Sequence, residues 1–388
     1  MSKLYSPLTA LKEGHWFKLI CGASYQHLPA VRSLALAYAL AGADCIDVAA
    51  DPAVVMMAKE ALNAAERLSE VCYSVKDSFI RPWLMVSLND GEDPHFRKAV
   101  FEFGDCPTDC DRPCETICPA QAITFSAHAD GFSGVVPALC YGCGRCLPLC
   151  PVEHISTQSH VTPPAAAADL ILGGVDALEI HTQVGHEADF ARLWSVIRPH
   201  LSQLKLVAIS CPDGAGLIRY LQYLWLLMQP LNLPLIWQAD GRPMSGDIGR
   251  GTTHAAVRLA QKLLMADLPG YVQLAGGTNQ HTVHKLRSLG LLRSPQSSSP
   301  TIAGVAYGSY ARSLLTPVIN RLDPQEDQEN HFPSVRGDRL TRLEDSPALL
   351  SQAIGLAKSL VEPIKQISLA LSALFLLMPH SLVCSATL

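Results

Sequence analysis

The stretch LVAISCPDGAGLIRYLQYLWLLMQPLNLPLIWQAD, residues 206–240, contains one complete strand–helix–strand unit. Residues 206–211 and 235–240 are short, almost uninterrupted apolar runs, as expected for strands buried on both faces. Residues 216–229 have the length and apolar periodicity of a helix, and a polar, glycine-containing turn precedes them. A strand that returns through a helix to a second strand is typical of a parallel sheet.

The same unit recurs along the chain and predicts the fold class. Eight strand-like runs alternate with helical stretches, and they are FKLICG (17–22), CIDVAA (45–50), WLMVSL (83–88), ALEIHT (177–182), LVAISC (206–211), LIWQAD (235–240), YVQLAGG (271–277) and IAGVAYG (302–308). Eight such repeats favour an α/β protein with a TIM-like (β/α)8 barrel. An open, doubly wound α/β sheet is the alternative, because propensity and periodicity do not distinguish the two.

Polar or glycine-rich residues follow most of these runs, at the barrel face where active sites are built. After the seventh and eighth runs, glycine-rich loops occupy positions at which many barrels bind phosphate, so flavin mononucleotide (FMN) is a candidate cofactor. The binding residues would be Gly276, Gly277, Asn279, Gly308 and Ser309, with further polar contacts from His181, Asp213, Asp240 and Arg242. The structural alternative is that the glycines only permit tight turns, while Asp51 and Asn279 cap helices.

Eight of the thirteen cysteines lie between Cys106 and Cys150. The N-terminal residues do not resemble a signal peptide, so we predict a cytoplasmic protein, in which clustered cysteines favour metal over disulfides. The group CYGCGRCLPLCP, residues 140–151, has the C-x2-C-x2-C-x3-C-P spacing of bacterial iron–sulfur proteins. The five other cysteines, which we expect to pack as small apolar residues, are Cys21, Cys45, Cys72, Cys211 and Cys384.

The first cysteine group, CPTDCDRPCETICP at residues 106–119, has wider C-x3-C-x3-C-x3-C-P spacing. With strand-like runs at 100–103 and 122–125, the two groups together resemble the two-cluster ferredoxin module. The ligand exchange of that module implies two clusters of the [4Fe-4S] type, one held by Cys118, Cys140, Cys143 and Cys146 and one by Cys106, Cys110, Cys114 and Cys150. The irregular first group leaves open a [3Fe-4S] cluster or a tetrahedral zinc site.

Composition and hydropathy limit the remaining possibilities. The formal net charge is −5 and no basic patch is evident, which argues against nucleic acid as a partner. The apolar run at 367–379 is about 20 Å long as a helix, too short for the ~30 Å core of a bilayer, so we expect no transmembrane span but leave open peripheral membrane contact. The expected domains are 1–92 and 161–320 for the barrel, 93–160 for the inserted module, and 321–388 for a charged linker and helices.

Several segments together resemble the light-dependent period proteins of cyanobacteria. They are WFKLICGASYQHLP (16–29), AGADCIDVAADPAVV (41–55), PWLMVSLNDGEDPHFRKAVF (82–101), both cysteine groups, AGGTN (275–279) and GVAYGSYAR (304–312). The resemblance implies an iron–sulfur protein that conveys light-dependent redox state to the circadian clock through clock and clock-input proteins. The electrons would come from photosynthetic electron transport. A different function, an oxidoreductase with a ligand at the barrel mouth, stays open beside it.

Overall fold

The computed structural model describes residues 6–72, 79–125, 133–159, 168–169, 173–241, 251–294, 299–322 and 342–376, with side chains only to 70 and 365 in the first and last ranges. Three sequence predictions therefore lie wholly or largely outside the described residues. They are the contact by Arg242, the packing of Cys72 and Cys384, and the charged linker after 321.

Eight parallel strands close into a barrel in the order β1-β12-β11-β10-β9-β8-β3-β2. Each predicted run supplies one strand, so the barrel is confirmed and the open-sheet alternative is wrong. The strands are β1 (Trp16–Ile20), β2 (Cys45–Ala49), β3 (Trp83–Asn89), β8 (Ala177–His181), β9 (Leu206–Pro212), β10 (Leu235–Asp240), β11 (Tyr271–Ala275) and β12 (Gly304–Tyr307).

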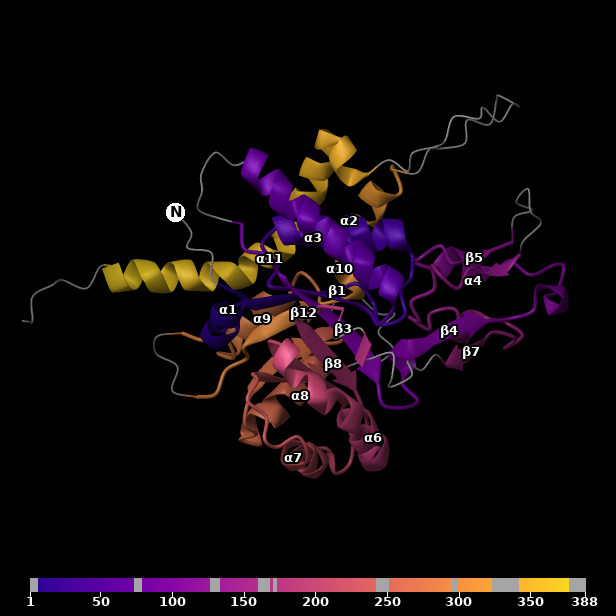
Figure 1. Ribbon diagram of the computed structural model, residues 1–388. Coiled ribbons are helices and arrows are strands. Elements are labelled where there is room, and N and C mark those ends of the chain that lie inside the picture. The colour runs from indigo at the N-terminus through magenta and orange to yellow at the C-terminus, as the bar shows by residue number, and fades with distance from the viewer. Residues whose placement is uncertain are drawn as a thin grey trace, which may run out of the picture.

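Helices surround this barrel (Figure 1). Asp51 caps α3 as predicted, since its Oδ1 accepts hydrogen bonds from the backbone N–H groups of Ala53 and Val54. The helices are α1 (Pro7–Glu13), α2 (Leu28–Leu40), α3 (Pro52–Cys72), α6 (Glu187–Ile197), α7 (Leu217–Leu227), α8 (Thr253–Met265), α9 (Thr282–Ser288), α10 (Ser309–Ile319) and α11 (Pro347–Leu376), with 3-10 turns η4 (Arg198–Gln203) and η5 (Leu343–Asp345).

Alternate residues of each strand face the helices or the barrel interior. The outward residues form one large core with the helices. At the amino-terminal end of the barrel, the interior is closed by Leu11 of α1 together with apolar strand residues such as Trp16, Met85 and Ile236. The lower interior is therefore a packed apolar plug, and any site has to lie in the middle of the barrel or at its carboxyl-terminal mouth.

The segment between β3 and β8, called the insert, lies outside the barrel and forms two small antiparallel sheets (Figure 1). Ile123, Phe125 and Ile155 form its own apolar core together with several cysteines. The strand predicted at 100–103 is wrong in position, because β4 ends at Val100 where its pairing with β7 ends. The elements are η1 (Pro94–Phe96), β4 (Arg97–Val100), η2 (Phe103–Asp105), α4 (Pro113–Ile117), β5 (Ile123–Thr124), β6 (Gly134–Val135), η3 (Leu147–Leu149) and β7 (Ser156–Ser159).

The C-terminal helix α11 packs on the barrel through side chains between 347 and 365. Ala353, Ala357 and Leu360 are buried there, and Lys365 forms an ion pair with the buried carboxylate of Asp44. Among the helices that the structure describes, none is long and apolar enough to cross a membrane.

Candidate functional site

One pocket of the insert brings cysteines from both groups together. It is lined by Cys118 from the first group and by Cys140, Cys143 and Cys146 from the second. These are the four residues that the ferredoxin resemblance assigns to one cluster. Because the lining supplies four thiols, it matches the donor set that a cubane iron–sulfur cluster takes.

The other four cysteines also influence one another. Burial raises the pKa of the Cys106 thiol, and the neighbouring Cys110 and Cys150 raise it further. The pKa of Cys114 is raised by burial first, and then by Cys150 and Cys110. These four residues are the second predicted ligand set. Cys118, the last cysteine of the first group, lies in the pocket of the other set instead. This placement does not favour a zinc site built from the four cysteines of the first group.

Backbone N–H groups point at sulfur atoms in both sets. Ala122 N lies 3.2 Å from Cys118 Sγ and Ala99 N lies 3.5 Å from Cys140 Sγ. In the other set, His154 N lies 3.2 Å from Cys150 Sγ and Arg112 N lies 3.4 Å from Cys110 Sγ. Such hydrogen bonds stabilise thiolate charge and help to set the reduction potential of a bound cluster. The insert thus offers this support to both groups.

The barrel mouth is a second cavity, of about 80 Å³, which is enough for several water molecules or a small polar group. Its floor contains Glu179 and Gln238 from the strands, and its wall contains Tyr141, Gly142 and Cys143 from the second cysteine loop. Cys143 lines both this cavity and the four-cysteine pocket. The cysteine loop therefore roofs the barrel mouth.

The cysteine loop is fixed to the barrel by Arg312 of α10. Its guanidinium carbon lies 4.0 Å from the centre of the Tyr141 ring, a cation–π contact. Arg312 Nη1 also donates a hydrogen bond to the carbonyl oxygen of Ile20, at 2.9 Å. One buried side chain therefore joins the end of β1 to the loop that carries Cys143.

Only some of the residues predicted at the mouth line the cavity. Gly276, Gly277, Gly308 and Ser309 line the cavity, as do Asp240 and His181. Asn279 is buried, and its Oδ1 accepts a hydrogen bond from the backbone N–H of His281 in the turn before α9. The N-cap residue of α9 is His281 and no side chain caps it, so the predicted capping by Asn279 is wrong. Asp213 is exposed and forms an ion pair with Lys262, 2.6 Å from it.

The isolated cysteines that the structure describes behave as packing residues. Cys21, Cys45 and Cys211 are all buried. Burial raises the pKa of Cys21 and of Cys211 to about 12, which keeps both thiols neutral. This agrees with their predicted role.

A buried polar layer across the barrel was missed by the sequence analysis. Lys18, which is fully buried, forms ion pairs with Glu179 and, at 3.5 Å, with Asp47. Further hydrogen bonds connect these side chains to the rest of the layer, which consists of Ser87, Ser210, Gln238 and Gln273. A signal was present, because seven of the eight strand-like runs carry at least one polar residue at an inward position.

The two carboxylates that face Lys18 in this layer differ in their pKa values. Burial opposes the charge on Lys18, but Glu179 and Asp47 outweigh it and raise the pKa of Lys18. Burial raises the pKa of Asp47 to about 6, although Lys18 partly opposes the change. Burial alone would also raise the pKa of Glu179, but Lys18 and His181 hold it at about 2. Glu179 is therefore the main counterion of Lys18, because both carboxylates compete for one ammonium group.

Comparison with known proteins gives a consistent result. Residues 106–161 match the family model of the LdpA Fe-S cluster-binding domain, and residues 170–363 match that of the light dependent period A C-terminal domain. The chain is 53% identical over 361 residues to light dependent period A of Synechococcus elongatus, covering 93% of this chain and 94% of that protein.

Solved structures resemble the chain more weakly. GGGPS from Thermoplasma volcanium has a TM-score of 0.39 at 8% identity, covering 93% of this chain and 96% of that one. Tryptophan synthase of Mycobacterium tuberculosis has a TM-score of 0.38 at 11% identity, covering 92% and 98%. The sequence matches, which include both cysteine groups and most of the barrel, show that the chain belongs to the light dependent period A family.

Proposed function

We propose that this protein is an iron–sulfur redox sensor of light-dependent period control, and that it conveys cellular redox state to the circadian clock through protein partners. The family supports an iron–sulfur protein in period control. The observation that supports the redox role is that Cys118, Cys140, Cys143 and Cys146 line one pocket, and that Cys143 also lines the barrel mouth.

Each set of cysteines would hold one cluster, which we propose to be of the [4Fe-4S] type. Cys118, Cys140, Cys143 and Cys146 would hold one, and Cys106, Cys110, Cys114 and Cys150 the other. A cluster supplies reversible one-electron chemistry when it is bound. The protein's part is to provide thiolates, hydrogen bonds to their sulfur atoms and a surrounding of low polarity.

A change of one unit charge at the cysteine loop can be transmitted because the loop is packed on the barrel. Tyr141 and Arg312 form the direct contact, and Cys143 belongs to the same loop. Reduction next to a guanidinium changes the local electrostatic energy, which can shift the loop or a partner bound over it. Clock and clock-input proteins would detect this change by binding at the insert. The electrons that reduce the cluster would come from photosynthetic electron transport. The proposed location is the cytoplasm, with or without peripheral membrane contact.

The test is a redox titration of protein purified without oxygen. Visible absorbance and EPR should show cluster signals that change reversibly with potential, and binding of a clock-input partner should differ between the oxidised and reduced forms. Clusters that do not change state over the potentials of cellular electron carriers would contradict redox sensing. Equal partner binding in both forms would contradict the proposed transmission.

One observation favours a second candidate function, an oxidoreductase with FMN or another phosphate-bearing ligand at the mouth. Gly276, Gly277, Gly308 and Ser309 line a cavity that also contains Cys143. Those loop residues would bind the phosphate, while the flavin would supply hydride and electron transfer. A yellow chromophore, released by acid and fluorescent, would support this function. Protein that is purified without bound flavin, and that binds none when FMN is added, would contradict this function.

A further inference from the structure

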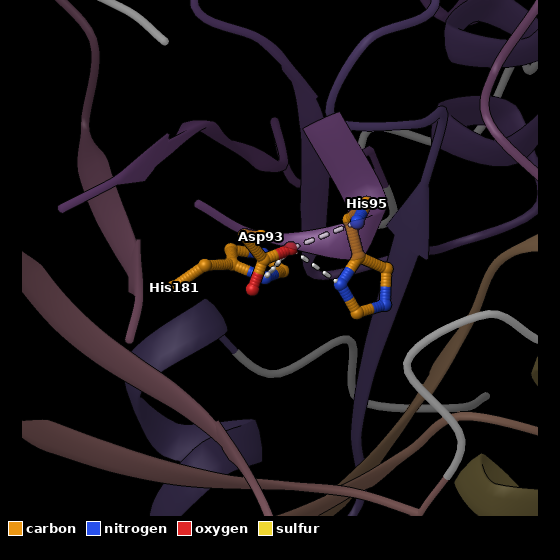
Figure 2. Close-up of side chains that lie close together, drawn as sticks. All are labelled: Asp93, His95 and His181. Carbon is orange, nitrogen blue, oxygen red and sulfur yellow. Dashed lines mark hydrogen bonds and ion pairs between the residues drawn. The ribbon is translucent and has the colours of Figure 1, made fainter. Parts of the chain in front are cut away.

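Three side chains converge at the barrel mouth beneath the cysteine loop. Asp93 and His95 belong to the turn at η1 by which the chain enters the insert, and His181 is the last residue of β8. One potential ligand atom from each lies within 4.8 Å of the other two. Figure 2 shows the Asp93 carboxylate between the two imidazole rings. His95 and His181 also line the mouth cavity.

The hydrogen-bond partners of the two rings indicate which nitrogen carries the proton. His181 Nε2 lies 3.0 Å from Glu179 Oε1, and His95 Nε2 lies 3.1 Å from Asp240 Oδ2. Because an ionised carboxylate only accepts hydrogen bonds, each Nε2 must be the N–H donor. On His181 the other nitrogen, Nδ1, is an acceptor when that ring is neutral. His95 Nδ1 also faces a carboxylate, Asp93 Oδ1, and donates a hydrogen bond to it, so a metal ion bound there would displace that proton.

Both Nδ1 atoms face the same carboxylate oxygen. Asp93 Oδ1 lies 2.9 Å from His95 Nδ1 and 3.8 Å from His181 Nδ1. Once the Nδ1 proton of His95 is displaced, the two rings direct two nitrogen lone pairs, and Asp93 directs one anionic oxygen, at a single small region. Acceptors that converge in this way need a cation between them. Such separations match the spacing of neighbouring ligands around a metal ion with bonds of about 2.1 Å.

We propose that Asp93, His95 and His181 bind one divalent first-row transition-metal ion, Zn²⁺ or Fe²⁺, through Oδ1 and the two Nδ1 atoms. Two histidines and one carboxylate are a donor set that both ions take, with the remaining positions open to water or substrate. The side chains of Asp93 and His181 are 8% and 6% exposed and that of His95 is 25% exposed, so the open positions face the cavity.

The surrounding carboxylates strengthen the assignment. Histidine ligands of metals commonly donate their second N–H to a carboxylate, which fixes the ring and makes it more basic. Glu179 and Asp240 occupy that position on His181 and His95 respectively. Glu179 is itself held by Lys18, so the polar layer of the barrel becomes the outer support of the metal site.

The experiment uses the full chain with its clusters loaded, dialysed without oxygen against Zn²⁺. Zinc and iron are counted separately, because the clusters contribute only iron. We expect one Zn²⁺ per chain. Asp93→Asn is isosteric and keeps an oxygen that can cap η1, but it removes the anionic ligand. Losing a hydrogen-bond partner of a ligand already weakens metal binding about 10–100-fold, so this variant should weaken zinc binding by at least that factor. His181→Gln should do the same, and Asp240→Asn should weaken binding 10–100-fold.

His186→Gln is the matched control, because His186 Nδ1 also lies 2.9 Å from a carboxylate, Asp90 Oδ1, but within the described ranges this pair belongs to no group of three potential metal ligands. This variant should bind zinc as the wild type does. Mn²⁺ gives an independent measurement, since pulsed EPR detects bound imidazole nitrogen, which thiolate sites lack. Unchanged cluster absorbance and circular dichroism would show that each variant is folded.

Two results would overturn the proposal. One is a wild-type chain that takes up neither Zn²⁺ nor Mn²⁺. That result would mean that His95 stays protonated on both ring nitrogens and donates hydrogen bonds to Asp93 and Asp240. The other is zinc affinity that stays at the wild-type value in both folded variants, Asp93→Asn and His181→Gln.

Discussion

Cys118, the last cysteine of the first group, lines the same pocket as Cys143 of the second group. Cys118 is the C-cap residue that follows α4 within the insert, whereas Cys143 lies in the loop that roofs the barrel mouth. The regularly spaced group is thus completed by a residue that precedes it in the sequence. This relationship gives the ligand assignment two direct tests.

Cys143→Ser should remove one cluster and leave the barrel folded, because the insert has its own core. The iron and sulfide content per chain should fall by about half, because one of two four-iron clusters is lost. Chemical analysis and visible absorbance measure the loss, and circular dichroism follows the barrel. Cys211→Ser, at a buried cysteine outside the insert, is the control and should keep all its iron. Full iron in Cys143→Ser would disprove the assignment.

Pairs of substitutions should show which cysteines share a cluster. Cys118→Ser added to Cys143→Ser should cause no further loss of iron, because both residues would serve the same cluster. Cys150→Ser added to Cys143→Ser should remove nearly all of it. Losses that are additive within one set would mean that its two residues serve different clusters, and would contradict the assignment. The measurement is again iron and sulfide per chain, with EPR to distinguish the remaining cluster.

Gly142→Ala should damage the junction between the cysteine loop and β4. Gly142 has a φ of +71°, and a Cβ there would lie 2.2 Å from the carbonyl oxygen of Arg97. Left-handed strain and this overlap together predict a lower cluster content and a lower melting temperature. Gly104→Ala, in the same insert but with open space around its Cα, should change neither quantity. Equal behaviour of the two variants would show that the loop is not held as described.

Lys18→Met should destabilise the barrel strongly. It leaves Glu179 and Asp47 buried without their cation, and breaking a buried ion pair costs about 3–5 kcal/mol. Urea unfolding followed by circular dichroism measures the change. Adding Glu179→Gln should restore part of the loss. Lys205→Met removes an exposed pair with Asp176 and should cost no more than about 1 kcal/mol. Similar costs for Lys18→Met and Lys205→Met would contradict the buried layer's role.

Asp47 should give the fold a particular pH dependence. Burial raises its pKa to about 6, above the ordinary value of 3.8, so the folded state binds more protons between those values. The associated stability is fully present below pH 4 and is lost as the pH rises through 6. Relative to Asp47→Asn, the wild type should therefore lose about 3 kcal/mol in all, about two thirds of it between pH 4 and 6. A difference that does not vary with pH over that range would refute the shift.

Local patterns were sufficient for the barrel. Each of the eight runs predicted for the barrel is a strand, because inward and outward residues of a parallel barrel are both buried and leave a short apolar signature. The register of the small sheets was not predictable. β4 pairs with β7 across both cysteine groups, and that pairing depends on how the intervening loops fold around the cysteines.

The residues of the barrel mouth divide in the same way. Gly276, Gly308 and His181 could be proposed from their place after strands, since strand ends in a barrel meet at one face. Asp93 and His95 could not, because they belong to the start of the insert and nothing in the local pattern places them over β8.

The sequence by itself determined the eight-stranded barrel, the position of the insert and the cysteines that make this an iron–sulfur protein, because these follow from local periodicity and spacing. Only the tertiary structure decided that Lys18 meets Glu179, 161 positions away, and that Asp93 and His95 meet His181 under the cysteine loop. Closing the barrel brings distant strands to the same interior level, and contacts across that interior depend on register and closure rather than on neighbouring residues.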